Sequence, residues 1–174
     1  MKRFFLLGIT LMVSVAMLMT ACKKDEVKNN GNNGGGGTAA GYVDLGLPSG
    51  TKWKSVNETG GYNGFYTFDE AVSLFGDKLP TKEQMEELID LCTWTWQNGG
   101  YKVTGTNGNS IDLPAAGSRD CDGNVDCVGA HGSYWTSTPS ESGQAWYFDF
   151  MSDNQMGMDD YVYCYGFSIR LVQE

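Results

Sequence analysis

The stretch AWYFDFMSDNQMGMDDYVYCYGFSIRLV, residues 145–172, contains three short runs of aromatic and aliphatic residues, of which the first is followed by a polar segment and the second ends on a glycine. The runs AWYFDFM, DYVYCYG and FSIRLV are typical of β-strands, because aromatic and β-branched side chains fit the surface of a pleated sheet. The segments between them are too short for crossover helices. The end of the chain is therefore predicted to form mostly antiparallel sheet.

Two segments upstream have instead the apolar spacing of amphipathic helices. Each begins with a capping box, in which Thr67 is followed by Glu70 and Thr81 by Gln84. Further short runs, TWTWQ, YKVTGT, SIDLPAAG and SYWTST, lie between the second helix and residue 145. This order predicts an α+β fold in which two helices pack on short, mostly antiparallel strands.

The N-terminal part of the chain has a different composition. Residues 1–21 have the layout of a secretory signal, and LMTAC, residues 18–22, resembles the lipobox at which bacterial lipoproteins are cleaved before the cysteine that is lipidated, here Cys22. A transmembrane helix is the alternative. Residues 22–41 are rich in Gly and Asn and are predicted to be a flexible tether, and residues 42–174 form one domain.

The start of the tether, CKKDE, resembles the signal that sends lipoproteins of Bacteroidetes to the outer face of the outer membrane. We therefore expect a lipid-anchored protein at the cell surface, with a periplasm-facing anchor as the alternative. Loss of residues 1–21, which carry two basic and no acidic residues, changes the formal net charge from −9 to −11. Such an acidic chain is not expected to bind nucleic acid, and its membrane contact is predicted through the lipid anchor only.

Four of the five cysteines remain once Cys22 is assigned to lipid. Cys121 and Cys127 flank the segment DGNVD and are predicted to form a disulfide in an oxidising compartment. Cys92 is expected to be an inert buried thiol, although a pairing with Cys164 is left open. The segment DCDGNVD partly mimics a calcium loop but lacks the turn glycine and the last glutamate, so no metal site is predicted.

The sequence does not indicate an enzyme. His131 is the only histidine, which excludes a metal site with several histidines, and its glycine neighbours favour a loop residue over a catalytic base. Carboxylates are numerous, but no pair is singled out by its spacing. We therefore expect no catalytic residue and no cofactor.

Six segments resemble, in the same order, the Fibrobacter succinogenes major paralogous domain, a family of secreted and lipid-anchored bacterial proteins. They are YVDLGLPSGTKW, LPTKEQMEELID, CTWTW, LPAAGSRD, GSYWTSTP and GFSIRLV, and the resemblance covers residues 42–172. It implies a C-type-lectin-like fold related to that of formylglycine-generating enzymes. Those enzymes need a pair of reactive cysteines near the C-terminus, where this chain has only Cys164, so their activity is not implied.

The C-terminal runs also predict a binding surface. In YVYCYG, the tyrosines share one strand face and Val162 and Cys164 share the other, which we expect to be buried. The predicted ligand-binding residues are Tyr147, Asp149, Ser152, Asp153, Asn154, Gln155, Asp159, Asp160, Tyr161, Tyr163 and Tyr165. Antibody paratopes have a similar composition, because tyrosine gives a large contact area at low entropic cost. Tyrosine as an ordinary strand residue and Asp and Asn as turn residues are the alternative.

The expected partner is an extracellular protein or glycan, and the alternative role is a structural or adhesive subunit of a cell-surface assembly. The family resemblance adds a hypothesis about variation. In many of these proteins the segment before a GFSVRLV-like anchor is the variable region of a diversity-generating retroelement, which converts asparagine codons to Tyr, Asp, Ser, Gly, Cys or His codons. The resemblance thus implies that the surface between GSYWTST and GFSIRLV is diversified.

Overall fold

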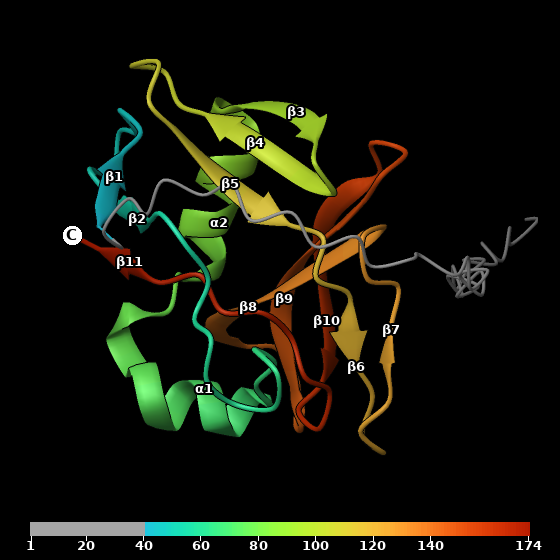
Figure 1. Cartoon of the computed structure of the whole chain (residues 1–174). Coiled ribbons are helices and arrows are strands. Elements are labelled where there is room, and N and C mark those ends of the chain that lie inside the picture. Colours follow the sequence, from blue (N-terminus) through green and yellow to red (C-terminus); the bar gives the residue numbers. More distant parts are fainter. Residues whose placement is uncertain (1–40) are drawn as a thin grey trace, which may run out of the picture.

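The computed structural model describes residues 41–174 (Figure 1). The predicted signal peptide of residues 1–21, the lipidated Cys22 and all but the last residue of the predicted tether lie outside the described residues. These assignments stay predictions. Within residues 41–174, no helix is long and apolar enough to span a bilayer.

Short strands make up most of the described chain. The elements are β1 (Tyr42–Asp44), β2 (Lys52–Lys54), α1 (Phe68–Phe75), η1 (Gly76–Lys78), α2 (Lys82–Leu91), β3 (Thr93–Gln97), β4 (Gly100–Thr104), β5 (Ser110–Pro114), β6 (Ser118–Arg119), β7 (Val125–Asp126), β8 (His131–Pro139), β9 (Gln144–Met151), β10 (Met156–Val162) and β11 (Val172–Gln173). They form sheets in the orders β1-β2-β11, β10-β9-β8, β3-β4-β5 and β6-β7, and every strand pair is antiparallel.

The predicted fold class is wrong. The described chain is 43% strand and 16% helix, arranged as four small antiparallel sheets with two short helices. It is therefore richer in β structure than the expected α+β fold, a C-type-lectin-like arrangement of two helices packed on strands. The physical reason is that the helices have only 8 and 10 residues, whereas nearly every run after Cys92 pairs as a strand.

Both predicted helices form, and both begin at the predicted capping boxes. The Thr67 hydroxyl accepts a hydrogen bond from the backbone N–H of Glu70, and the Glu70 carboxylate accepts one from the N–H of Thr67. Thr81 and Gln84 form the same pair of bonds at the start of α2. Each box satisfies two donors that would otherwise lack partners in the first helical turn.

The sheet of β8, β9 and β10, which we call the central sheet, separates two hydrophobic clusters. The first core cluster contains Leu45, Leu47, Trp53, Met85, Leu88, Tyr101, Val103, Ile111, Leu113, Ala115, Tyr134, Phe148, Phe150 and Val172. The second core cluster contains Tyr66, Phe68, Ala71, Leu79, Trp135, Ala145, Tyr147, Phe167, Ile169 and Leu171. Successive side chains of a strand point to opposite faces of the sheet. Those of β9, the middle strand, therefore enter the two clusters alternately.

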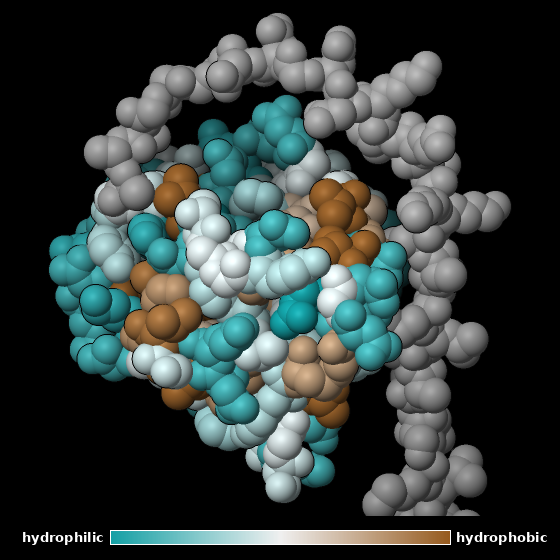
Figure 2. All heavy atoms as spheres, turned by 60° about the horizontal axis from the view of Figure 1, so that its bottom comes forward, coloured by the Kyte–Doolittle hydropathy of each residue, from teal (hydrophilic) through white to brown (hydrophobic). Residues whose placement is uncertain are grey.

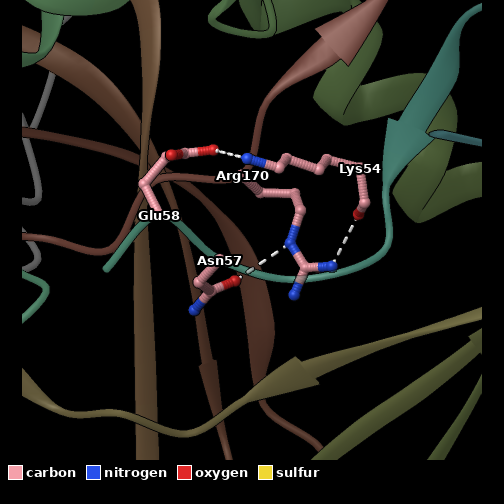
Figure 3. Close-up of polar contacts among 4 residues, drawn as sticks. All are labelled: Lys54, Asn57, Glu58 and Arg170. Carbon is pink, nitrogen blue, oxygen red and sulfur yellow. Dashed lines mark hydrogen bonds and ion pairs between the residues drawn. The ribbon is translucent and has the colours of Figure 1, made fainter. Parts of the chain in front are cut away.

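A buried arginine ties the C-terminal segment to the rest of the fold. Arg170 is 1% exposed. Its guanidinium donates hydrogen bonds to the Asn57 side chain (2.9 Å), the Lys54 carbonyl (2.7 Å) and the Asp112 carbonyl (2.6 Å). Figure 3 shows the first two of these contacts, with the ion pair between Lys54 and Glu58 beside them. Three hydrogen bonds compensate for the cost of removing this charge from water.

Candidate functional site

The register of β9 and β10 brings several predicted site residues onto one face of the central sheet. Tyr147 lies opposite Asp159, and Asp149 lies opposite Gly157. Tyr161, at the next position along β10, has the same orientation because side chains alternate along a strand. We call Tyr147, Asp149, Asp159, Tyr161 and Tyr165 the tyrosine–carboxylate face. Tyr161 and Tyr165 meet there edge to face, with ring centroids 4.5 Å apart.

The predicted orientation of the last tyrosines is wrong. Tyr161, Tyr163 and Tyr165 are half-buried against the second core cluster, whereas Val162 is 41% exposed and Cys164 is exposed. A tyrosine ring offers more apolar area than a valine or cysteine side chain, so the side with the rings covers the core. The rings therefore have fixed positions and present only part of their surface to solvent.

Tyr147 is the most buried member of the tyrosine–carboxylate face, although the sequence predicts that it points to solvent. It is 7% exposed, and its ring lies 4.6 Å from that of Phe167 and 6.0 Å from that of Trp135, measured between centroids. Its hydroxyl makes no hydrogen bond with any described residue and is not fully buried. Burial raises its pKa, and Asp149 and Asp159 raise it further, so the hydroxyl keeps its proton.

Each carboxylate of this face keeps one oxygen without a partner among residues 41–174. Asp149 Oδ1 contacts His131 Nε2, which makes no hydrogen bond with a described residue, and accepts a hydrogen bond from the Ser133 hydroxyl at 3.3 Å. Asp159 Oδ1 accepts from the backbone N–H of Asp160 at 2.9 Å. The Oδ2 atom of each is left for solvent or a ligand.

Sequence reasoning missed the role of His131. Its glycine neighbours predict a loop residue, but it is the first residue of β8 and its side chain reaches Asp149 on β9. The alternation in HGSYWTST could have extended the strand to this residue. No sequence signal places Asp149 beside it, because that contact depends on the register between two strands.

The structure separates the other predicted ligand-binding residues from this face. Ser152, Asp153, Asn154 and Gln155 are exposed at the turn between β9 and β10, where Tyr101 donates a hydrogen bond to Asn154 (3.0 Å). The predicted single patch is therefore divided.

Two other predicted residues lie at the opposite end of β10. Asp160 lies on the other side of the strand from Tyr161 and accepts a hydrogen bond from Ser140. Tyr163 stacks on Phe68 of α1, with 4.5 Å between ring centroids. Both side chains have a partner within the fold, so neither needs a ligand.

The predicted disulfide is also wrong. Cys121 pairs with Cys164 and not with Cys127, and the bond joins the β6–β7 turn to the loop after β10. Within that turn, Asp120 accepts hydrogen bonds from the backbone N–H groups of Asp122 (2.9 Å) and Asn124 (2.8 Å). These bonds already close the turn without a disulfide across it.

The segment that partly mimics a calcium loop uses its first carboxylate, Asp120, within the turn. Both oxygens of Asp120 accept hydrogen bonds, and the bond from the Asn124 side chain is the largest cause of its lowered pKa. Within the described part of the chain, no group of three or more His, Cys, Asp or Glu residues could hold a metal ion.

The turn does reach the tyrosine–carboxylate face. The pKa of Tyr165 is raised by its hydrogen bond with Tyr161, by burial, and by the charges of Tyr161, Asp120 and Asp122. The Cys121–Cys164 disulfide joins this turn, which carries Asp120 and Asp122, to the residue that precedes Tyr165.

The C-terminal third of the chain is strongly acidic. Residues 120–174 contain nine Asp and Glu residues and one basic residue, Arg170, which is buried.

Figure 2 shows the side of the molecule that carries α1, where hydrophilic residues surround separate groups of hydrophobic ones. This side is better suited to polar and aromatic contacts than to burial of one continuous apolar patch.

A hollow lies away from this face, beside the turn between β3 and β4. It has a volume of about 160 Å³ and is lined in part by Gln97, Tyr101 and Asp112. Sites for small organic ligands usually enclose about 300–1,000 Å³. This hollow is therefore a weaker candidate for a ligand site than the tyrosine–carboxylate face.

One comparison with known proteins found a match. A family model described as "Domain of unknown function (DUF8237)" matches residues 93–172. The matched part runs from β3 to the start of β11 and includes the whole tyrosine–carboxylate face. No curated protein and no solved structure matches the chain significantly. The resemblance to the Fibrobacter paralogous domain stays a prediction.

Proposed function

We propose that this protein binds an extracellular ligand through the tyrosine–carboxylate face while a lipid on Cys22 anchors it at the outer surface of the outer membrane. The observation that carries the proposal is the Tyr147 hydroxyl. It lacks a hydrogen-bond partner among residues 41–174, although its ring is buried and fixed. The hydroxyl reaches solvent at the end of a fixed ring, so a ligand could bond to it without breaking a contact within the fold.

The way the face is built favours binding. Tyr161 and Tyr165 are held by ring contacts with each other and with Phe167. Because their rotamers are already restricted, a ligand would lose little affinity to the ordering of side chains. Tyrosine also combines a large apolar area with a polar end, which suits it to exposed interfaces.

We propose a binding role and not a catalytic one. An enzyme related to the formylglycine generators would require a reactive thiol at Cys164, and that sulfur is bonded to Cys121. That sulfur is therefore not available as a nucleophile.

The binding proposal can be tested before the ligand is identified. Residues 22–174 with Cys22→Ser, which prevents lipidation, are applied to glycan and surface-protein arrays. We expect at least one specific ligand whose signal falls in Tyr147→Phe and Tyr161→Phe, variants that keep the rings in the core. Ligands that bind both variants as well as the wild type would place the site elsewhere.

Diversification by a retroelement is a separate part of the proposal. Tyr147, Asp149, Asp159, Tyr161 and Tyr165 are all residues that an altered asparagine codon can encode, and all five belong to the tyrosine–carboxylate face. The source genome tests this directly. We expect a nearby reverse transcriptase gene and a near-copy of the DNA for this segment, and the lack of both would remove diversification without affecting binding.

The second candidate, a subunit of a surface assembly, is favoured by the free edge of β10. This strand is the last in its sheet, and the Val162 carbonyl accepts a hydrogen bond from the Tyr165 N–H on the side away from β9. By alternation, the backbone groups of Met156 and Met158 on that side have no strand partner among residues 41–174. Light scattering distinguishes the roles, because a subunit should form oligomers and a receptor module should be a monomer.

A further inference from the structure

Gly157 has no side chain and leaves open space above its position in the tyrosine–carboxylate face. It lies opposite Asp149, and a Cβ atom added to it would have no heavy atom within 4 Å. Tyr147 and Asp159 form the next pair along the same two strands. Asp149 and Asp159 are thus diagonal neighbours, a relation that places Cβ atoms about 7–8 Å apart or slightly less. We call Tyr147, Asp149, Gly157 and Asp159 the niche.

The niche offers three oxygens that no described residue uses. They are Oδ2 of Asp149, Oδ2 of Asp159 and the hydroxyl of Tyr147. The tyrosine is 7% exposed, so its hydroxyl is held in position by the packing of its ring. An ammonium group has three hydrogen-bond donors and no acceptor, which matches this set.

The charges around the niche also favour a cation. His131 already pairs with Asp149 on one side, and the guanidinium of Arg119 lies over the ring of Tyr62, 5.4 Å from its centroid. Arg170, the other Lys or Arg residue of residues 119–174, is buried and donates its hydrogen bonds within the fold. No basic side chain of residues 41–174 other than His131 forms an ion pair with either carboxylate of the niche.

We propose that the niche binds the ammonium group of a lysine side chain on a protein partner. This inference rests on the proposed binding function and selects a basic protein over a neutral glycan as the ligand. The ammonium group would lie between the two carboxylates and donate its third hydrogen bond to the Tyr147 hydroxyl. A calcium ion suits the niche less well, because it requires six to eight oxygen ligands.

The test uses residues 22–174 with Cys22→Ser and two synthetic peptides, acetyl-Gly-Lys-Gly-Lys-Gly-amide and the same peptide with both lysines Nε-acetylated. Nuclear magnetic resonance follows the backbone amides of Tyr147, Gly157 and Asp159 during titration. We expect saturable shifts with the charged peptide and none with the acetylated one. Equal shifts with both peptides, or no shift at these amides, would overturn the proposal.

Two variants locate the peptide in the niche. Asp159→Asn keeps the shape and the bond from Asp160 but removes the charge, and should weaken binding about fivefold. Gly157→Ile places a side chain in the open space opposite Asp149 and should abolish binding. Its fold should survive because the site has open space and no positive φ. Asp153→Asn, at the exposed hairpin turn, is the matched control and should bind like the wild type.

The outcomes separate this inference from the proposed function. An array ligand that is lost in Tyr161→Phe but unaffected by Asp159→Asn and Gly157→Ile would support the binding face and remove the lysine niche. Charged-peptide shifts confined to the niche, with no array ligand that depends on Tyr161, would support the niche and remove the wider tyrosine contact.

Discussion

Removal of the Cys121–Cys164 disulfide should strongly destabilise the protein. The two cysteines are 43 residues apart in the sequence. For a closed loop of this length, the chain-entropy relation gives a loss of about 4 kcal/mol in the free energy of unfolding at 25 °C. The six-residue ring predicted from the sequence would contribute only about 2 kcal/mol. The measured loss of unfolding free energy therefore distinguishes the Cys121–Cys164 disulfide from a Cys121–Cys127 disulfide.

The assay is urea unfolding of the Cys121→Ser/Cys164→Ser double variant, followed by tryptophan fluorescence. With a slope of about 2 kcal/mol per molar urea, the midpoint should fall by about 2 M. Peptide mapping of the wild type without reduction should recover one linked peptide that contains both cysteines. A loss below about 1 kcal/mol, or no such linked peptide, would refute the pairing and the fixed position of the β6–β7 turn.

Three further predictions concern groups inside the fold. Arg170→Leu leaves the Asn57, Lys54 and Asp112 oxygens without their donor and should cost about 3–5 kcal/mol in urea unfolding, whereas a loss below about 1 kcal/mol would contradict the buried network. Burial raises the pKa of Tyr134 from 10 to about 12, so the unfolded chain ionises first. The melting temperature should therefore fall between pH 10 and 12, and less steeply in Tyr134→Phe; an equal slope would contradict this assignment. Burial, with a smaller effect of Glu87, raises the pKa of the Cys92 thiol to about 11, so maleimide should label it slowly at pH 8 in the folded protein and rapidly in urea.

Local sequence patterns predicted local structure well. The capping boxes at Thr67 and Thr81 gave the start of each helix, because all the atoms of that motif lie within one turn. Alternation in AWYFDFM correctly separated Phe148 and Phe150 from Tyr147 and Asp149. Where the signal is contained in a few consecutive residues, the sequence is sufficient.

Features that depend on distant contacts were not predictable in this way. Alternation shows which side chains share a face, but it does not show that both faces of β9 are covered, which is why it places Tyr147 in solvent. Spacing favoured the nearest cysteine as the partner of Cys121, whereas the fold brings Cys164 to it. The pairing of His131 with Asp149 likewise depends on strand register.

The tyrosine–carboxylate face is tested most directly by measuring the dissociation constant of one array ligand for four matched proteins. They are the wild type, Tyr147→Phe, Asp159→Asn and Asp153→Asn, each confirmed to be folded by its melting temperature. We expect weaker binding in Tyr147→Phe and Asp159→Asn, by about fivefold or more in each, and an unchanged constant in Asp153→Asn. Equal affinity in all four proteins would show that the ligand binds elsewhere and would contradict the proposed site.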